Sequence, residues 1–285
     1  MRLLSWNIQW GRGMDGRVDL AHIAATLRAI GDCDVICLQE VAVNFPGLHG
    51  SRGEDQVQEL SRLLPEYQCV YAPATDVDDG AGRRSQFGNA LLSRLPVGQV
   101  FRHLLPWPAD AAVPSMQRVM LEAVITLPWG SLRINTTHLE YYSAAMRAAQ
   151  IDAIRALHRE ACAHARRPRR GDGEEGGSFE VFPRPASAIL CGDMNFPPHA
   201  AERRRLLEPF GDSTLPWQDT WDLARPGIAH AATAGVHAQT FVDSPQCFDF
   251  IFITADLAPR LRAHGIDAAT TASDHQPVWI DLAAD

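Results

Sequence analysis

Many short segments of this chain are rich in valine, isoleucine and leucine but show little regular alternation between apolar and polar residues. A strand of this kind is apolar on both faces, so both faces must be covered, and helices are the usual cover. The pattern therefore predicts an α/β fold with buried strands. The expected strands are residues 3–8, 35–38, 67–71, 90–93, 119–127, 132–139, 188–191, 248–254 and 278–282.

Three other segments carry apolar residues at helical spacing, which predicts helices over residues 17–30, 54–64 and 143–165. Ser143 is placed to cap the third helix, because a serine side chain accepts from the free N–H groups at a helix start. With 285 residues, of which 46% are hydrophobic, the chain can bury a core without metals or disulfides. We expect a single domain over residues 1–285.

Residues 166–185 interrupt this pattern. They combine glycine, proline and charges of both signs without periodicity, which is typical of a flexible surface loop. Because charged runs are usually just solvated, we favour a solvent-exposed loop insertion over a contact with nucleic acid or a membrane.

The charge balance bears on possible partners and location. The chain has 26 arginines and no lysine against 34 acidic residues, a net charge of −8. Proteins that grip long nucleic acids non-specifically are usually basic, although a local basic groove remains compatible with this balance. The N-terminal apolar run is too short for a signal peptide, and no run approaches the roughly 18 apolar residues of a membrane span. The six cysteines are scattered without a Cys-x-x-Cys pair, so we expect a cytoplasmic, reduced protein.

Polar side chains occur where the predicted strands begin or end. They are Asn7, Glu40, His138, Asp193, Asn195, Asp249, Asp274 and His275. Polar groups at strand ends converge on one crevice in α/β folds, which is where ligands bind. Carboxylates, amides and two histidines, with no cysteine among them, form an oxygen-rich site that suits Mg²⁺ or Mn²⁺ better than zinc.

Two pairs within this set indicate chemistry. Asp193 and Asn195 are two positions apart, so on an extended segment both point the same way. One can orient a water molecule while the other donates to a phosphate oxygen. Asp249 with His275 would form a carboxylate–imidazole pair, which raises the basicity of the ring. Each motif alone is weak, because Gly-Asp-x-Asn is a common turn; their shared order is a stronger indication.

Together these motifs resemble those of the endonuclease/exonuclease/phosphatase superfamily, the deoxyribonuclease-like proteins. The matching segments are Ser5-Trp6-Asn7-Ile8, Leu38-Gln39-Glu40, Thr137-His138-Leu139, Gly192-Asp193-Met194-Asn195, Phe248-Asp249-Phe250-Ile251-Phe252 and Ser273-Asp274-His275-Gln276-Pro277. The resemblance runs from residue 3 to about 280 and omits only the loop at 166–185. It implies a four-layer α/β sandwich, in which two mixed sheets pack face to face with helices outside.

The resemblance also implies metal-dependent attack of water on a phosphate ester. By matching position, Glu40 is the principal ligand of Mg²⁺ or Mn²⁺, with Asn7 and Asp274 beside it. Asp193 orients or deprotonates the water, while His275, paired with Asp249, and His138 stabilise the charged oxygens or protonate the leaving group. The residues that the resemblance assigns to the phosphate oxygens are Asn195, His138 and Arg118.

The substrate remains open at this point. The expected partner is a phosphate ester, with nucleic acid as one class, and a phosphodiesterase or nuclease is favoured. The alternative is a phosphomonoesterase or a lipid- or inositol-type phosphoesterase. The histidine at this position, His138, is similar to that of the deoxyribonuclease, sphingomyelinase and inositol-phosphatase branches. The abasic-site endonucleases are the less similar branch. A non-catalytic binding module is least favoured, because no motif residue is missing. The sequence does not indicate an oligomeric state.

Overall fold

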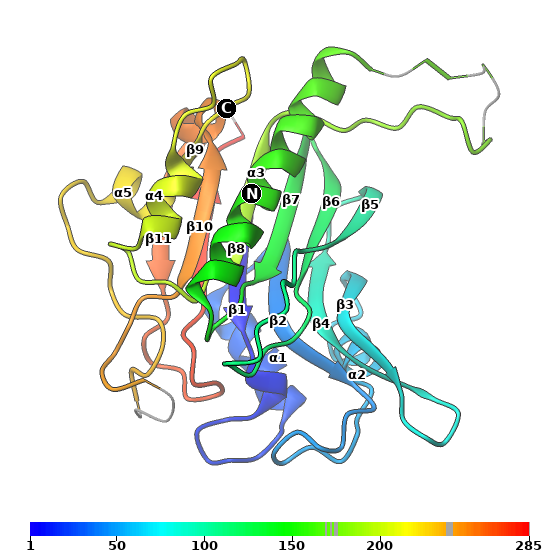
Figure 1. Ribbon diagram of the computed structural model, residues 1–285, viewed down its shortest axis with the longest axis vertical. Helices are drawn as coiled ribbons and strands as arrows, with labels where there is room; N and C mark the ends of the chain where they lie inside the picture. Colours follow the sequence, from blue (N-terminus) through cyan, green and yellow to red (C-terminus); the bar gives the residue numbers. More distant parts are fainter. Residues whose placement is uncertain (169, 172, 174–175, 238–241, 285) are drawn as a thin grey trace.

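The computed structural model describes the whole chain except residues 169, 172, 174–175, 238–241 and 285. Its strands form two six-stranded sheets (Figure 1). The first sheet has the order β11 (Leu261–Ile266), β12 (Val278–Leu282), β1 (Arg2–Asn7), β2 (Val35–Val43), β4 (Arg84–Ser93) and β3 (Gln68–Asp78). The second has the order β5 (Val97–Leu104), β6 (Val119–Leu127), β7 (Gly130–His138), β8 (Ala188–Asp193), β10 (Asp249–Thr254) and β9 (Trp217–Asp219). Both sheets are mixed, because β1 runs parallel to β2 and β7 runs parallel to β8.

Five α-helices accompany the sheets in the described residues. They are α1 (Leu20–Ile30), α2 (Gln56–Leu63), α3 (Ala144–Arg166), α4 (Ala201–Leu207) and α5 (Thr220–Ala224), with short 3₁₀ helices at Gln9–Gly11 and Ala255–Arg260. Ser143 caps α3 as predicted, since its side chain accepts from the Met146 N–H. The first helix begins at Leu20, three residues later than predicted, because the Asp19 side chain accepts from the His22 N–H and sets the helix start there.

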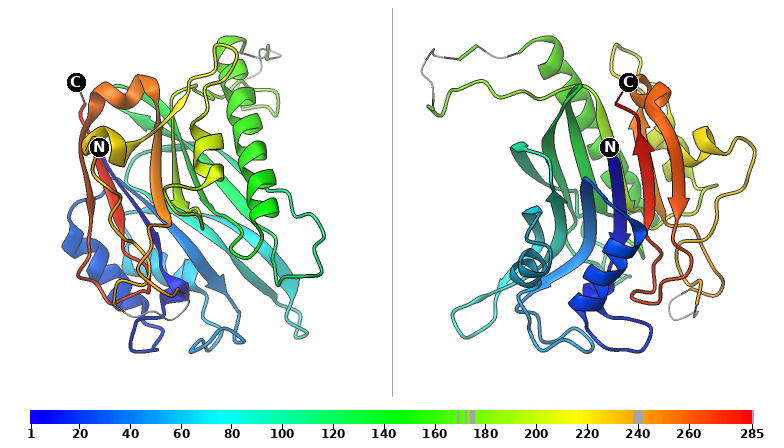
Figure 2. Two further views of the ribbon diagram at one scale, coloured as in Figure 1. Left: turned by 60° about the vertical axis from the view of Figure 1, so that its left-hand side comes forward. Right: turned by 180° about the vertical axis from the view of Figure 1, so that it is seen from behind.

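Three apolar cores hold these layers together. One lies between the two sheets and includes Leu3, Ile134 and Ile251. A second lies between the first sheet and helices α1 and α2, and a third lies between the second sheet and helices α3 and α4. Figure 2 shows α1 and α3 on opposite outer sides of the paired sheets. The predicted four-layer sandwich is therefore confirmed.

The same cores explain the weak alternation in the sequence. Successive residues of a strand point to opposite faces, so Leu3 enters the core between the sheets while Leu4 packs under the helices. Both faces are apolar because both are covered. The strands β5, β9 and β11, which the sequence did not predict, lie at or next to sheet edges. Exposed positions interrupt the apolar pattern of β5 and β11, and β9 has only three residues. The hairpin of β3 and β4 is longer than predicted, because its polar tip extends away from the core (Figure 1).

The connection between α3 and β8 contains the predicted loop insertion. It leaves the body of the molecule in Figure 1, and its residues 176–187 form neither helix nor strand. Four residues of the predicted loop lie outside the described part of the chain, so its flexibility stays a prediction. None of the helices in the described residues has the length and apolar character needed to cross a membrane.

Candidate active site

The register of the second sheet places three of the predicted site residues in one row. His138 at the end of β7 pairs with Asp193 at the end of β8, and Asp193 pairs with Asp249 at the start of β10. All three are in phase with residues of the core between the sheets, such as Ile134 and Ile251, so they point into the space between the two sheets. The row therefore forms one wall of a site at the edge of that core.

Gly192 allows the strands to come this close. Its φ is 139°, and an added Cβ would lie 1.9 Å from the carbonyl oxygen of Thr137. A side chain at this position would push β8 away from β7 and separate the two strand ends that carry His138 and Asp193.

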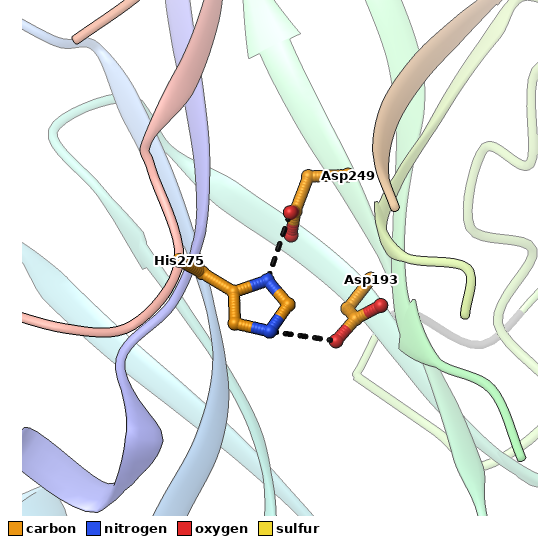
Figure 3. A group of neighbouring side chains, drawn as sticks. All are labelled: Asp193, Asp249 and His275. Atoms are coloured by element: carbon orange, nitrogen blue, oxygen red, sulfur yellow. Dashed lines mark hydrogen bonds and ion pairs between the residues drawn. The ribbon is translucent and has the colours of Figure 1, made fainter. Parts of the chain in front are cut away.

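His275, in the segment before β12, lies between two aspartates (Figure 3). Its Nδ1 is 2.9 Å from Asp249 Oδ2, and its Nε2 is 3.6 Å from Asp193 Oδ2. The indole N–H of Trp6 donates to the backbone carbonyl of His275 at 2.9 Å and holds that segment in place. Burial alone would lower the pKa of His275, but Asp249 and Asp193 outweigh burial and raise it well above its usual value.

Glu40 reaches the site because β2 contains a bulge. Leu38 pairs with Ala90 and Val41 pairs with Gly88, so two residues of β2 lie opposite one residue of β4. Glu40 has a φ of 59° in this bulge. Its carboxylate accepts from Asn7 Nδ2 at 2.9 Å and lies 3.8 Å from His138 Nδ1.

The two facing walls meet at one carboxylate oxygen, Oδ2 of Asp193. Asn7 of the first sheet donates to this atom from Nδ2 at 3.0 Å. The Nε2 atoms of His138 and His275 lie 3.5 Å and 3.6 Å from it. The site thus joins the ends of strands from both sheets.

Asn195 adopts a conformation that the sequence did not indicate. The strand ends at Asp193, and Asn195 has a φ of 51°, so the extended geometry expected for this pair is wrong. The Asn195 N–H donates to Asp193 Oδ1 at 3.0 Å, which forms a turn. Its side-chain Nδ2 donates to the Leu139 carbonyl at 2.8 Å, and this bond ties the turn to the end of β7.

Carboxylates are crowded in the site. Burial, with Asp274 as the next cause, raises the pKa of Glu40 to about 7. Burial also raises the pKa of Asp193, where Asp249 adds to the effect and His275 opposes it, and burial raises the pKa of Asp274. These shifts mean that the negative charges lack sufficient positive partners. Oxygen donors of this kind, lying close together, fit a hard divalent cation.

His138 has the opposite environment. Burial, together with the nearby charge of Arg118, lowers the pKa of this ring well below its usual value. Arg118 lies immediately before β6 and is 7% exposed. Arg118, His138 and Glu40 line one small cavity at the site. The structure therefore brings all nine predicted site residues into the same region, namely Asn7, Glu40, Arg118, His138, Asp193, Asn195, Asp249, Asp274 and His275.

Sequence reasoning missed one residue that contacts two predicted metal ligands. Gln9 donates from its backbone N–H to Asn7 Oδ1 at 3.0 Å and from Nε2 to Asp274 Oδ2 at 2.5 Å. It has a φ of 46°, a strained conformation for a residue other than glycine. Gln9 adjoins a motif segment, but nothing in the local pattern points to a contact 265 positions away along the chain.

A second acidic cluster lies away from the site, at β9 and α5. Asp219, Asp222 and His230 hold their ligand atoms within 4.8 Å of one another. Arg203 already provides a cation there, since its Nη2 lies 2.8 Å from Asp219 Oδ2 and also contacts Asp222. Asp219 Oδ1 accepts from the Trp221 N–H at 2.9 Å, so it caps the short helix α5.

The chain is similar to one known protein family. A profile of the Endonuclease/Exonuclease/phosphatase family matches residues 4–275. The chain belongs to this family. Family members are phosphoester hydrolases. No curated protein shows a significant sequence match to the chain.

Several solved structures of the family share the fold. The endonuclease/exonuclease/phosphatase of Beutenbergia cavernae DSM 12333 has a TM-score of 0.67 and 24% identity, covering 99% of this chain and 71% of that chain. The mannosyl-6-phosphatase of Bacteroides thetaiotaomicron has a TM-score of 0.68 and 16% identity, covering 99% of both chains. TDP2 of D. rerio, complexed with a single-strand DNA product, has a TM-score of 0.64 and 18% identity, covering 99% of this chain and 98% of that chain. At such identities the likeness shows a common fold.

Proposed function

We propose that this protein is a phosphodiesterase or nuclease that hydrolyses a phosphate ester with the help of Mg²⁺ or Mn²⁺. One observation carries the proposal. Asn7 of the first sheet donates to Asp193 Oδ2, and the Nε2 atoms of His138 and His275 lie beside the same oxygen. A carboxylate that can orient water, with an amide and two imidazoles beside it, is what attack of water on a phosphate ester requires.

The metal would be held by the oxygen atoms of Glu40, Asn7 and Asp274. When bound, it would polarise a phosphoryl oxygen and offset the negative charge that builds up on it. The pKa of Glu40, which burial raises and Asp274 raises further, is consistent with this assignment, because a bound cation would stabilise the charged carboxylate.

The protein side chains supply the other steps. Asp193 orients the attacking water or takes its proton, and its raised pKa suits proton transfer near neutral pH. His275 stays protonated because of Asp249, so it can donate to a phosphate oxygen or to the leaving group. The remaining phosphate contacts are assigned to His138, Asn195 and Arg118. The lowered pKa of His138 keeps its ring neutral, so it donates a single N–H.

A phosphomonoesterase is the second candidate. A mannosyl-6-phosphatase shares the fold over 99% of this chain, just as TDP2 with its DNA product does. The net charge of −8 argues against tight non-specific binding of long nucleic acids, which leaves smaller phosphate esters open. A binding module without activity is disfavoured, because every motif residue is present and in place.

The test is hydrolysis of bis(p-nitrophenyl) phosphate, a diester, and p-nitrophenyl phosphate, a monoester, with Mg²⁺, Mn²⁺ or EDTA. We expect diester cleavage that needs the metal and falls about a thousandfold or more in Asp193→Asn. Cleavage of the monoester alone would favour the second candidate. Full activity in EDTA or in Asp193→Asn would contradict the proposed site. With DNA or RNA as substrate, a steep fall of rate with salt would identify a nuclease.

A further inference from the structure

Arg118 is a buried cation that lies beside a carboxylate but does not use all of its N–H groups in hydrogen bonds. The side chain is 7% exposed, and its Nε lies 3.7 Å from Oε2 of Glu140, which is fully buried. This distance is an ion contact but is too long for a hydrogen bond. Neither atom has another hydrogen-bond partner in the described part of the chain. Glu140 therefore balances the charge of the guanidinium, but the Nε–H group of Arg118 donates no hydrogen bond in the described residues.

Other carboxylates could capture this guanidinium. Burial lowers the pKa of Arg118, and the charges of Glu140, Glu40 and Asp193 oppose that effect in this order. Arg118 and Glu40 also line the same small cavity with His138. Without a counter-ion outside the site, the attraction toward the site carboxylates would be unopposed, and the arginine would compete there with a metal ion.

The helix α3 holds Glu140 in position. Glu140 Oε1 accepts from the Tyr142 N–H at 2.9 Å, and the Glu140 N–H donates to Gln150 Oε1 at 2.9 Å. Arg147 donates from Nη1 to the carbonyls of Glu140 and Tyr141 at 3.1 Å and 2.7 Å. Both Arg147 and Gln150 belong to α3. The backbone of Glu140 is thus fixed by α3, and its carboxylate is oriented by the N–H of Tyr142.

The same helix steadies the segment that leads to Arg118. Gln150 Nε2 donates to the Pro106 carbonyl at 3.3 Å. Gln117 Nε2 donates to the carbonyls of Leu105 and Arg118 at 2.6 Å and 2.9 Å. The backbone on both sides of the Arg118–Glu140 contact is therefore anchored through Gln150.

We propose that Glu140 is a positioning residue that draws Arg118 away from Glu40 and Asp193 and keeps its N–H groups available for a phosphate oxygen of the substrate. The inference rests on the proposed phosphoesterase function and adds a residue that acts through Arg118. A second buried pair shows the alternative arrangement. Glu122 accepts a hydrogen bond from Arg184 at 2.9 Å and also contacts Arg133. The Arg184 guanidinium is therefore already hydrogen-bonded to its counter-ion. A guanidinium bound in that way would have to break a bond before it could hold a phosphate.

The test is a double-mutant cycle with Glu140→Gln, Arg118→Met and the double variant. We expect KM for the diester to rise about tenfold or more in Arg118→Met and about fivefold to tenfold in Glu140→Gln. The double variant should match Arg118→Met within about twofold, because Glu140 has no target once the arginine is gone. An unchanged KM in Glu140→Gln, or effects that multiply in the double variant, would overturn the proposal.

Binding of inorganic phosphate, measured by titration calorimetry, separates this proposal from the proposed function, because it needs no turnover. If the wild type binds phosphate but hydrolyses no ester, and Glu140→Gln weakens that binding about fivefold, the phosphoesterase function is wrong and the positioning role stands. If the wild type hydrolyses the diester but Glu140→Gln binds phosphate as tightly as the wild type does, the positioning role is wrong.

Two further variants control for folding. Glu122→Gln removes another fully buried carboxylate with arginine partners, and it should lower the melting temperature while leaving KM for the diester unchanged. Should Glu140→Gln fail to fold, Glu140→Asp keeps the charge on a shorter side chain, and we expect KM to rise about threefold. A rise in KM for Glu122→Gln equal to that of the Glu140 variant would show a general effect of stability and would overturn the proposal.

Discussion

Two clusters in this protein have the same composition, two aspartates and a histidine, but different surroundings. Asp193, Asp249 and His275 lie between the sheets, and Asp219, Asp222 and His230 lie at β9 and α5. In the second cluster Arg203 contacts both aspartates, so an arginine side chain offsets part of their negative charge. In the described residues no arginine forms an ion pair with the aspartates of the first cluster.

This difference fits the proposed catalytic role of the first cluster and a structural role of the second. The first cluster is fully buried, yet Asp249 Oδ1 has no hydrogen-bond partner in the described part of the chain. Such a cluster costs stability and is expected where a metal or substrate completes the charges. The second cluster caps a helix and joins α4 to β9, and an arginine completes it. The two clusters thus differ in the cation beside their aspartates, which is His275 in the first and Arg203 in the second.

The largest contrast is expected when the same substitution is made in both clusters. Asp249→Asn should lower kcat for the diester about a thousandfold, because the amide cannot stabilise the His275 imidazolium. Asp219→Asn should leave kcat within about threefold, because it changes only a cap and an ion pair. The kcat values measured under saturating metal test this. Equal losses in the two variants would remove the distinction between the clusters.

The second contrast concerns stability. Arg203→Met removes the arginine from the second cluster and leaves the buried Asp219 with only His230 and the Trp221 N–H as partners. We expect the free energy of unfolding to fall by roughly 3 kcal/mol, the usual cost of breaking one side of a buried pair. Urea denaturation at pH 7 measures it, and kcat should not change.

A matched control lies on the same helix. Arg205 forms ion pairs with Asp152 and Glu208, all of them on the surface. Arg205→Met should hardly change the free energy of unfolding, because exposed ion pairs contribute little. If Arg205→Met destabilises the protein as much as Arg203→Met does, the burial of Asp219 is not what makes the second cluster structural.

The sequence predicted the central strands and the polar residues at their ends for one physical reason. Strands covered on both faces leave continuous apolar runs, as in Ile189–Cys191, and the first polar residue after such a run marks the edge of the sheet. Strands at or beside a sheet edge, such as β5 and β11, have an exposed face, so their runs are interrupted and were not recognised. Pairing with neighbouring strands, which defines these strands, is not encoded in a local pattern.

The geometry within the site was less predictable. The bulge that turns Glu40 toward Asn7 depends on how β2 pairs with β4. Gln9 contacts a residue far away along the chain, and Glu140 is held by a residue of α3. The types of site residue could therefore be predicted from strand ends, whereas their supports required the three-dimensional arrangement.

The smallest contrast concerns pH and begins with a histidine beside the second cluster. His264 packs against Trp221 at 5.3 Å between ring centroids, and its Nδ1 lies 2.9 Å from Thr220 Oγ1. Burial lowers its pKa to about 4. The unfolded chain takes up a proton near pH 6.5, so between pH 6.5 and 4 the unfolded state binds more protons than the folded state. The free energy of unfolding therefore falls as the pH falls through this window.

His264→Phe should remove this dependence. The wild type should lose about 2 kcal/mol of unfolding free energy through His264 between pH 7 and pH 5, and the variant should lose that much less over the same interval. His158, whose pKa burial also lowers to about 4, lies on the buried face of α3 and should contribute a similar loss that His264→Phe leaves in place. Urea denaturation at both pH values gives the difference. An unchanged difference in His264→Phe would mean that burial does not lower the pKa of His264 in the folded protein.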